Sequence, residues 1–193
     1  MAYAHSETLA ASVKILVAGG FGVGKTTLVS SISEITPLHT EESITALSAG
    51  VDDMTGVEAK TTTTVALDFG RITIDRDLIL YLFGTPGQDR FWFLWDELVS
   101  GALGAVVLAD TRRLDGSFSA IDFFERRGLA FAVGVNCFDG APRYTPDEVR
   151  DALDLDPHVP VRLCDARNRE SCKQILTTLV EYLIARAGAV ARS

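Results

Sequence analysis

Apolar residues occur along this chain in short runs separated by polar and glycine-containing segments, and the spacing within the runs predicts secondary structure. Runs rich in β-branched or apolar residues are expected to form strands at Val13–Gly19, Thr61–Ile74, Leu78–Phe83, Ala105–Ala109, Ala130–Val135 and Val159–Leu163. Segments with helical spacing are Leu28–Ile35, Phe91–Ser100, Ser117–Arg127, Pro146–Leu155 and Ser171–Ala187.

The alternation of strands and helices predicts an α/β fold. We expect a mostly parallel six-stranded sheet that is covered by helices on both faces. One pair of strands differs from the others, because only residues 75–77 separate Ile74 from Leu78. A connection this short forces an antiparallel hairpin, since parallel neighbours need a crossover.

The segment 38–60 interrupts this regular order. It contains several acidic residues and few large apolar ones. We expect a short helix over Glu41–Leu47 and a mobile loop over the rest. A connection this long inside a compact domain is usually functional or disordered.

Length and charge limit the classes of function. The 193 residues suit one domain with a sizeable core, which we place at residues 12–193 after a short flexible lead, 1–11. The formal net charge of −8 argues against nucleic acid as a partner. No run is long enough to span a bilayer, and the sequence shows no signal peptide or lipidation motif, so we expect no membrane anchor. Three cysteines without paired metal spacing favour reduced thiols and a cytoplasmic protein.

One glycine-rich stretch carries the clearest chemistry. Residues 19–27 read GGFGVGKTT, the pattern G-x-x-x-x-G-K-[ST], between an expected strand and an expected helix. Such a loop turns backbone N–H groups toward an anion, and the helix points its positive end at the same place. Lys25 adds a charge for the outer phosphates, and the Thr26 hydroxyl suits Mg²⁺. The expected nucleotide contacts are Gly20, Phe21, Gly22, Val23, Gly24, Lys25, Thr26 and Thr27.

In an open α/β sheet, ligands bind beyond the carboxyl ends of the strands, so the segments that follow strands are candidate contacts. They read GTPGQD after Phe83, NCFD after Val135 and CDAR after Leu163. Together with the phosphate-binding loop, these motifs resemble those of the Ras-like small GTPases over roughly residues 12–187. Within that superfamily the chain looks most like the bacterial MglA-type and actinobacterial conservon-type proteins. The resemblance implies a P-loop NTPase with a Ras-like G domain that binds GTP or GDP and Mg²⁺.

The resemblance implies that two segments read the base. NCFD stands where the family has N-K-x-D, and DAR stands where it has S-A-K. Asp139 would bind the guanine N1 and exocyclic amine, Asn136 would brace the loops, and the Ala166 N–H would bind the guanine O6. Cys137 replaces a lysine whose stem packs along the base, so we expect weakened guanine binding. The expected base contacts are Asn136, Cys137, Asp139, Asp165, Ala166 and Arg167.

Two further motifs resemble the family's switch regions. TVALDF begins at Thr64 and resembles switch one, which makes Thr64 the second candidate Mg²⁺ ligand; the neighbouring threonines 61–63 leave the register open by one or two residues. GTPGQDRF resembles the family's D-T-A-G-Q-E-R-F. There the Gly87 N–H would sense the γ-phosphate, and Gln88 would orient the attacking water.

Some departures from the family pattern bear on the metal and on the reaction rate. Gly84 stands where the family has an aspartate that holds Mg²⁺ through water, and MglA-type proteins also lack this aspartate. Asp68 on the adjacent strand is either a substitute for it or a plain strand-end carboxylate. Phe21 stands where Ras has glycine and would crowd the space in which a glutamine and an arginine finger meet. Thr63 stands where MglA-type members tend to carry an arginine, so we expect no intrinsic arginine finger on that pattern.

We therefore predict a switch protein that hydrolyses GTP slowly, with Gln88 and Lys25 as its catalytic residues. The resemblance implies protein partners, a roadblock-type regulator and a sensor-kinase-like protein, and Phe93, off the apolar stripe of its helix, is a candidate contact. Two alternatives stay open. A nucleotide-gated binding module that barely hydrolyses is favoured by Gly84 and Phe21, and Cys137 leaves room for a P-loop ATPase.

Overall fold

The structure, a computed structural model, describes residues 11–45, 62–75, 78–87 and 92–190. The strands in this part of the chain are β1 (Ala11–Ala18), β2 (Leu38–Thr45), β3 (Thr62–Asp75), β4 (Leu78–Gly84), β5 (Ala102–Ala109), β6 (Phe131–Asn136) and β7 (Val161–Cys164). The helices are α1 (Lys25–Ile32), α2 (Trp92–Val99), α3 (Asp115–Arg127), α4 (Pro146–Ala152) and α5 (Arg169–Val190). Each predicted strand has a counterpart among these, and so does each predicted helix except the short one over Glu41–Leu47, with ends that differ by a few residues.

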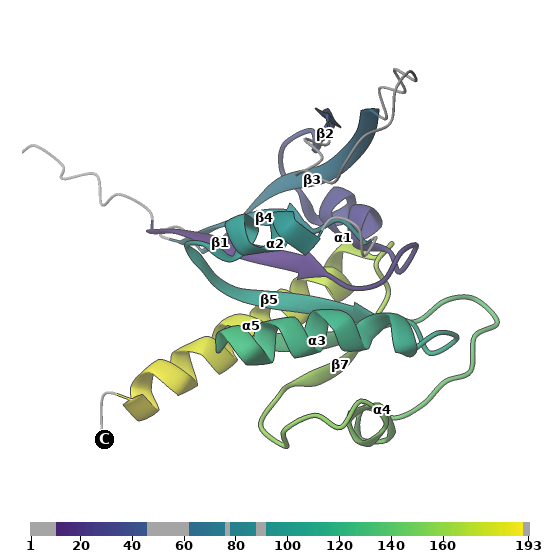
Figure 1. The fold of residues 1–193 in the computed structure, drawn as a ribbon. Helices are drawn as coiled ribbons and strands as arrows, with labels where there is room; N and C mark the ends of the chain where they lie inside the picture. Colours follow the sequence, from purple (N-terminus) through teal and green to yellow (C-terminus); the bar gives the residue numbers. More distant parts are fainter. Residues whose placement is uncertain (1–10, 46–61, 76–77, 88–91, 191–193) are drawn as a thin grey trace, which may run out of the picture.

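The strands of the described residues form one seven-stranded sheet in the order β2-β3-β4-β1-β5-β6-β7 (Figure 1). The five strands from β4 to β7 in this order pair in parallel. β3 pairs with β4 in the antiparallel direction, which confirms the predicted hairpin. The α/β fold with a mostly parallel sheet is confirmed, and one strand is added to the six that the apolar runs predict.

The added strand corrects the prediction of a short helix over Glu41–Leu47. Residues Leu38–Thr45 form β2, which pairs antiparallel with β3 from Leu38 opposite Phe69 to Thr45 opposite Thr62. β3 is longer than β4, and its residues before Asp68 pair with β2 alone. Backbone hydrogen bonds to the part of β3 before Asp68 determine the extended conformation of β2. A polar strand therefore forms without the apolar pattern from which a strand is predicted. The rest of the expected loop lies outside the described residues.

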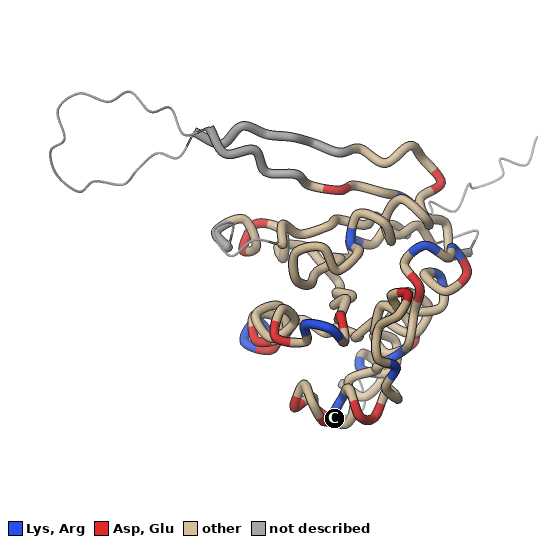
Figure 2. Tube along the Cα trace, turned by 90° about the vertical axis from the view of Figure 1, so that its right-hand side faces the viewer, with Lys and Arg blue, Asp and Glu red and all other residues tan. Residues whose placement is uncertain are grey.

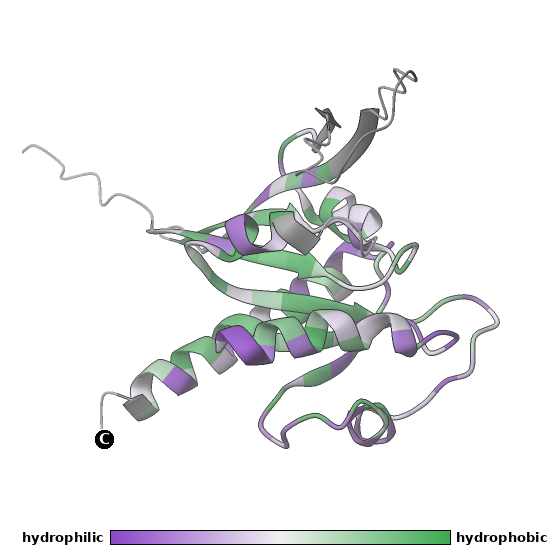
Figure 3. Ribbon diagram, viewed as in Figure 1, coloured by the Kyte–Doolittle hydropathy of each residue, from purple (hydrophilic) through white to green (hydrophobic). Residues whose placement is uncertain are grey.

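Two hydrophobic cores lie on opposite faces of the sheet. In β1, Ile15 and Val17 belong to the core beneath α1 and α5, whereas Leu16 and Ala18 belong to the core beneath α2, α3 and α4. All four side chains are fully buried. The central strands are accordingly among the most hydrophobic parts of the ribbon (Figure 3). Burial on both faces explains why these strands read as continuous apolar runs.

Helix α2 carries its apolar side toward α3, as its spacing predicts. Trp95 is 4% exposed and packs against Phe123 and Phe124, with ring centroids 5.2 and 5.6 Å apart. Aromatic pairs at this separation add to the stabilisation that burial of their area provides. The side chain of Phe93, the predicted partner contact, lies outside the described part of the molecule.

Charged residues lie mainly on the helices and loops, and the inner strands are largely free of them (Figure 2). Asp68 is an exception, because it is a strand residue with only 8% of its surface exposed. No helix in the described ranges is long and apolar enough to cross a membrane.

Candidate functional site

The P-loop connects the end of β1 to the start of α1. Gly19 and Gly24 have φ angles of 131° and 107°, which L side chains rarely adopt. A Cβ atom at Gly19 would lie 2.3 Å from the Leu108 carbonyl oxygen, and one at Gly24 would lie 2.7 Å from the Asn136 amide nitrogen. These two glycines therefore let the loop pack closely against β5 and against Asn136 at the end of β6. Helix α1 begins at Lys25, earlier than the predicted Leu28, because the loop leads directly into it.

Lys25 supplies a buried positive charge beneath the loop. Its Nζ donates to the carbonyl oxygens of Gly19 at 2.8 Å and Gly20 at 2.7 Å, and the residue is 9% exposed. Burial lowers the pKa of Lys25 to about 8, against an opposing effect of the Asp68 carboxylate. Gly87 packs on the same ammonium group, since a Cβ atom there would lie 2.5 Å from Nζ. The predicted Gly87 and Lys25 are thus brought together at the P-loop.

Thr26 and Asp68 form the second polar pair of the site. The Thr26 hydroxyl donates to Asp68 Oδ2 at 2.6 Å. Asp68 stands opposite Gly84 in the β3–β4 ladder, and a Cβ atom at Gly84 would lie 3.0 Å from both Cβ and Oδ2 of Asp68. The Asp68 carboxylate thus fills the space above Gly84. Thr85 follows Gly84 in the chain, and its buried hydroxyl has no hydrogen-bond partner among the described residues. The Thr26 hydroxyl and the Asp68 carboxylate are hard ligands of the kind that Mg²⁺ prefers, directly or through water.

Asn136, at the end of β6, joins the P-loop to the segment after β7. Its Nδ2 donates to the Val23 carbonyl oxygen at 2.9 Å, and its Oδ1 accepts from the Ala166 N–H at 3.0 Å. Asn136 is buried, with 5% of its surface exposed. This is the bracing position that the resemblance implies. The Ala166 N–H, expected to bind a guanine oxygen, is engaged by Asn136 here.

The remaining base-segment residues gather at the surface. Arg167 donates to both oxygens of Asp139 and to both oxygens of Asp165. Hydrogen bonds from Arg167 hold the pKa values of Asp139 and Asp165 below their ordinary range. Cys137 donates its backbone N–H to the Cys164 carbonyl oxygen at 2.7 Å, which ties the two segments together. The segments after β6 and β7 therefore meet, as predicted.

The predicted Gln88 lies outside the described residues. Thr64 lies in β3, paired with Ser43, four residues before Asp68. At the rise of an extended strand this places the Thr64 backbone roughly 13 Å from that of Asp68. Phe21 is 68% exposed at the surface of the P-loop.

One contact of the P-loop that the sequence motifs did not predict comes from the segment after β5. Arg113 lies in the loop between β5 and α3, and its Nη2 donates to the Phe21 carbonyl oxygen at 3.1 Å. A Cβ atom at Gly20 would lie 3.2 Å from the Gly116 carbonyl oxygen, so the start of α3 packs on the P-loop backbone. Position after a strand was the signal that could have found Arg113.

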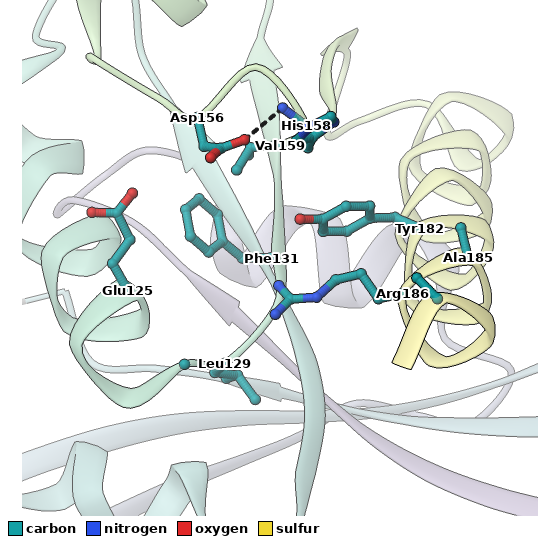
Figure 4. Close-up of a pocket in the computed structure, with 11 residues that line it drawn as sticks. Glu125, Leu129, Phe131, Asp156, His158, Val159, Tyr182, Ala185 and Arg186 are labelled. Atoms are coloured by element: carbon teal, nitrogen blue, oxygen red, sulfur yellow. Dashed lines mark hydrogen bonds between the residues drawn. The ribbon is translucent and has the colours of Figure 1, made fainter. Parts of the chain in front are cut away.

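A cavity of about 720 Å³ lies elsewhere in the molecule (Figure 4). Phe131 forms part of it at the start of β6, Tyr182 faces it from α5, and Asp156 accepts the His158 N–H at its rim. The lining residues are Glu125, Gly128, Leu129, Phe131, Asp156, His158, Val159, Tyr182, Ala185, Arg186 and Ala189. None of them belongs to the predicted nucleotide contacts, and the amino end of β6 is opposite the end that carries Asn136. The candidate site therefore lies at the edge of the sheet that carries the P-loop and Asn136, not at this cavity.

The sheet order and the P-loop define a P-loop protein with the fold of a G domain, and known structures agree. The chain is similar to the G domain of the FeoB iron transporter of T. maritima, with a TM-score of 0.62, 19% identity and coverage of 89% of this chain and 99% of that one. It is also similar to the cytosolic domain of that transporter in a GDP form (TM-score 0.64, 18% identity, 90% of this chain), of which it spans 64%. The FeoB G-domain from Methanococcus jannaschii gives a TM-score of 0.59 at 12% identity, with 89% and 97% coverage. At these identities the similarity shows the fold.

Sequence comparison identifies the family. Residues 17–186 match the family described as conserved hypothetical ATP binding protein, and the chain belongs to it. The chain is also similar to the uncharacterized protein MJ1339 of Methanocaldococcus jannaschii, with 35% identity over 129 residues, which are 66% of this chain and 71% of that protein.

Proposed function

We propose that this protein is a guanine-nucleotide switch, which binds GTP or GDP with Mg²⁺ and hydrolyses GTP slowly. The observation that carries the proposal is the Asn136 amide, which hydrogen-bonds to Val23 of the P-loop and to Ala166. Through these two hydrogen bonds Asn136 joins the phosphate-binding loop to the two segments that resemble base-reading motifs, so that the three parts form one site. In this proposal Asp139, three residues after Asn136, would read the base.

Asp139 is the residue on which guanine selection depends. Guanine presents two N–H donors on one edge, N1–H and the 2-amino group, which a carboxylate accepts in a bidentate manner. Adenine presents no such pair, so it would leave the carboxylate unsatisfied. The description of the matched family as ATP binding supports the second candidate, a P-loop ATPase. Cys137 in place of a base-packing lysine also leaves that candidate open.

Mg²⁺ would be held by Thr26, with Asp68 acting in place of a carboxylate at position 84. The pair is already hydrogen-bonded, and Gly84 leaves room for the Asp68 side chain. When bound, the metal would neutralise charge on the phosphate oxygens. Thr64 would join as a second ligand only after its part of β3 leaves the strand pairing seen here. Such an order change on nucleotide binding is a known type of switch.

Slow turnover, on the order of 10⁻⁴ s⁻¹ without a partner, is expected for a small GTPase of this kind. Gln88 would orient the attacking water, Gly87 would contact the γ-phosphate and Lys25 would stabilise the developing charge. A roadblock-type regulator and a sensor-kinase-like protein are the proposed partners in a cytoplasmic pathway. A single-turnover rate of GTP hydrolysis of several per second by the isolated protein would contradict slow turnover. If wild type showed no hydrolysis and Gln88→Ala did not differ from it, a binding module without hydrolysis would be favoured instead.

Equilibrium titration with GDP, GTP, ADP and ATP, in Mg²⁺ and in chelator, tests the choice of base. We expect guanine nucleotides to bind at least about 100-fold more tightly than adenine nucleotides. Asp139→Asn should remove most of this preference, whereas Arg162→Ala should keep it, because Arg162 contacts Gln174 away from the site. Equal or tighter binding of ATP would overturn the guanine proposal in favour of the ATPase.

A further inference from the structure

Arg167 occupies the carboxylate that the proposed function assigns to the base. Its Nη1 donates to Asp139 Oδ2 at 2.7 Å and its Nη2 to Oδ1 at 3.2 Å. The same guanidinium donates through Nε and Nη2 to Asp165, at 2.9 Å in each case. One side chain thus bridges the two acidic residues of the two base segments.

The guanidinium and the guanine edge present the same hydrogen-bonding pattern. Each is planar and offers two adjacent N–H donors to one carboxylate. A single Asp139 carboxylate cannot receive both donor pairs in the same plane. Guanine therefore has to replace the Asp139 side of the Arg167 bridge before it is read.

We propose that Arg167 is a specificity-determining latch, an internal stand-in for the guanine edge that covers Asp139 until a guanine nucleotide displaces it. The inference rests on the proposed function, in which Asp139 reads the base. It assigns Arg167 a role opposite to that of a base support: in the free protein Arg167 competes with the ligand.

Asp165 is suited to tether the latch when it opens. Two hydrogen bonds to Asp165 hold the guanidinium independently of Asp139. The Arg167 backbone N–H also donates to Asp165 Oδ1 at 2.9 Å, and the Asp165 N–H is held by the Ser171 hydroxyl at 2.9 Å. Arg167 therefore loses one ionic partner on opening and keeps the other, so its charge is never left unpaired.

The latch affects the purines unequally. Guanine needs the Asp139 carboxylate and binds only when the latch is open. Its apparent affinity is therefore the intrinsic affinity multiplied by the fraction of protein in which the latch is open. Adenine has no donor pair for Asp139 and leaves the latch closed. The cost is small, because the Arg167 and Asp139 side chains are 56% and 86% exposed and an ion pair in water is weak.

The test compares GDP with ADP on the full chain, in Mg²⁺, for wild type, Arg167→Ala and Arg167→Lys. We expect Arg167→Ala to raise the ratio of GDP affinity to ADP affinity about two- to fivefold. The ratio is the readout because loss of a positive charge from the protein affects the binding of both anionic nucleotides alike. Arg167→Lys, which keeps the charge but not the planar fork, should give a smaller rise. Arg162→Ala is the matched surface control and should leave the ratio unchanged.

A double-mutant cycle with Asp139→Asn shows whether the effect passes through the carboxylate. In that background Arg167→Ala should no longer change the ratio. An unchanged ratio in the single variant would overturn the latch, and a fall would show instead that Arg167 supports the bound base. These failures are distinct from failure of the proposed function, in which wild type would show no guanine preference for Asp139→Asn to remove.

Discussion

The two ends of the candidate site are built differently. At the phosphate end, Lys25 and Asp68 are 9% and 8% exposed and are held by hydrogen bonds within the loop and the sheet. At the base end, Asp139 and Arg167 are mostly exposed and hold each other at the surface. Charges act more strongly when they are shielded from water. Substitutions at the phosphate end should therefore have large effects, and those at the base end should tune the choice of ligand.

The largest effect is expected for Asn136→Ala, at the buried junction of the two ends. The change leaves the Val23 carbonyl and the Ala166 N–H without their partner, and two buried unsatisfied groups cost about 3 kcal/mol of unfolding free energy. Chemical denaturation of the nucleotide-free protein measures it. Thr145→Ala, which removes an exposed capping box from α4, should cost about 1 kcal/mol and serves as the comparison. A loss no greater than this control would show that the junction is not a structural brace.

Asp68→Asn should act through the metal. The amide still accepts the Thr26 hydroxyl, but it removes the negative charge, so Mg²⁺ affinity of the nucleotide complex should fall about 10- to 100-fold. Chelator titration of nucleotide release reports this affinity. The double variant Asp68→Gly with Gly84→Asp moves the carboxylate to the facing strand position, where the removed side chain leaves room, and should recover part of the loss. Equal Mg²⁺ affinity of wild type and Asp68→Asn would make Asp68 a plain strand carboxylate.

The pKa of Lys25 predicts a pH dependence of GDP binding. In the free protein burial lowers this pKa to about 8, and adjacent phosphates should raise it in the complex. Binding then takes up a proton above pH 8, so affinity decreases as pH rises, by about tenfold between pH 7 and pH 9. The Cys172 thiol, with a pKa raised to about 11 by burial, does not titrate in this window. Calorimetry in buffers of different ionisation enthalpy measures the proton uptake directly, and a flat profile would mean that Lys25 stays charged in the free protein.

The smallest effect is that of Arg167 on the ratio of GDP to ADP affinity, because its ion pair with Asp139 is exposed to water. If Arg167→Ala changed binding more than Asp68→Asn changes Mg²⁺ affinity, the contrast between a buried and an exposed end would not hold.

Much of the fold could be predicted because its pattern is local. Strands buried on both faces read as apolar runs, and the short turn between Ile74 and Leu78 requires a hairpin. The strand β2 could not be predicted in this way, since its eight residues carry few apolar side chains and gain their partner only from β3. A polar segment at a sheet edge owes its conformation to backbone pairing, which leaves no period in the sequence.

The amino-acid sequence by itself determined the P-loop, because glycines at fixed positions, Lys25 and Thr26 act within one short stretch of backbone. It also placed NCFD and DAR after strands, where parallel strands end together. Only the tertiary structure decided which side chains share a space. Strand register sets Asp68 over Gly84, and the meeting of two loops lets Arg167 cover Asp139. Such contacts join residues far apart in the chain, and no local preference of either residue records them.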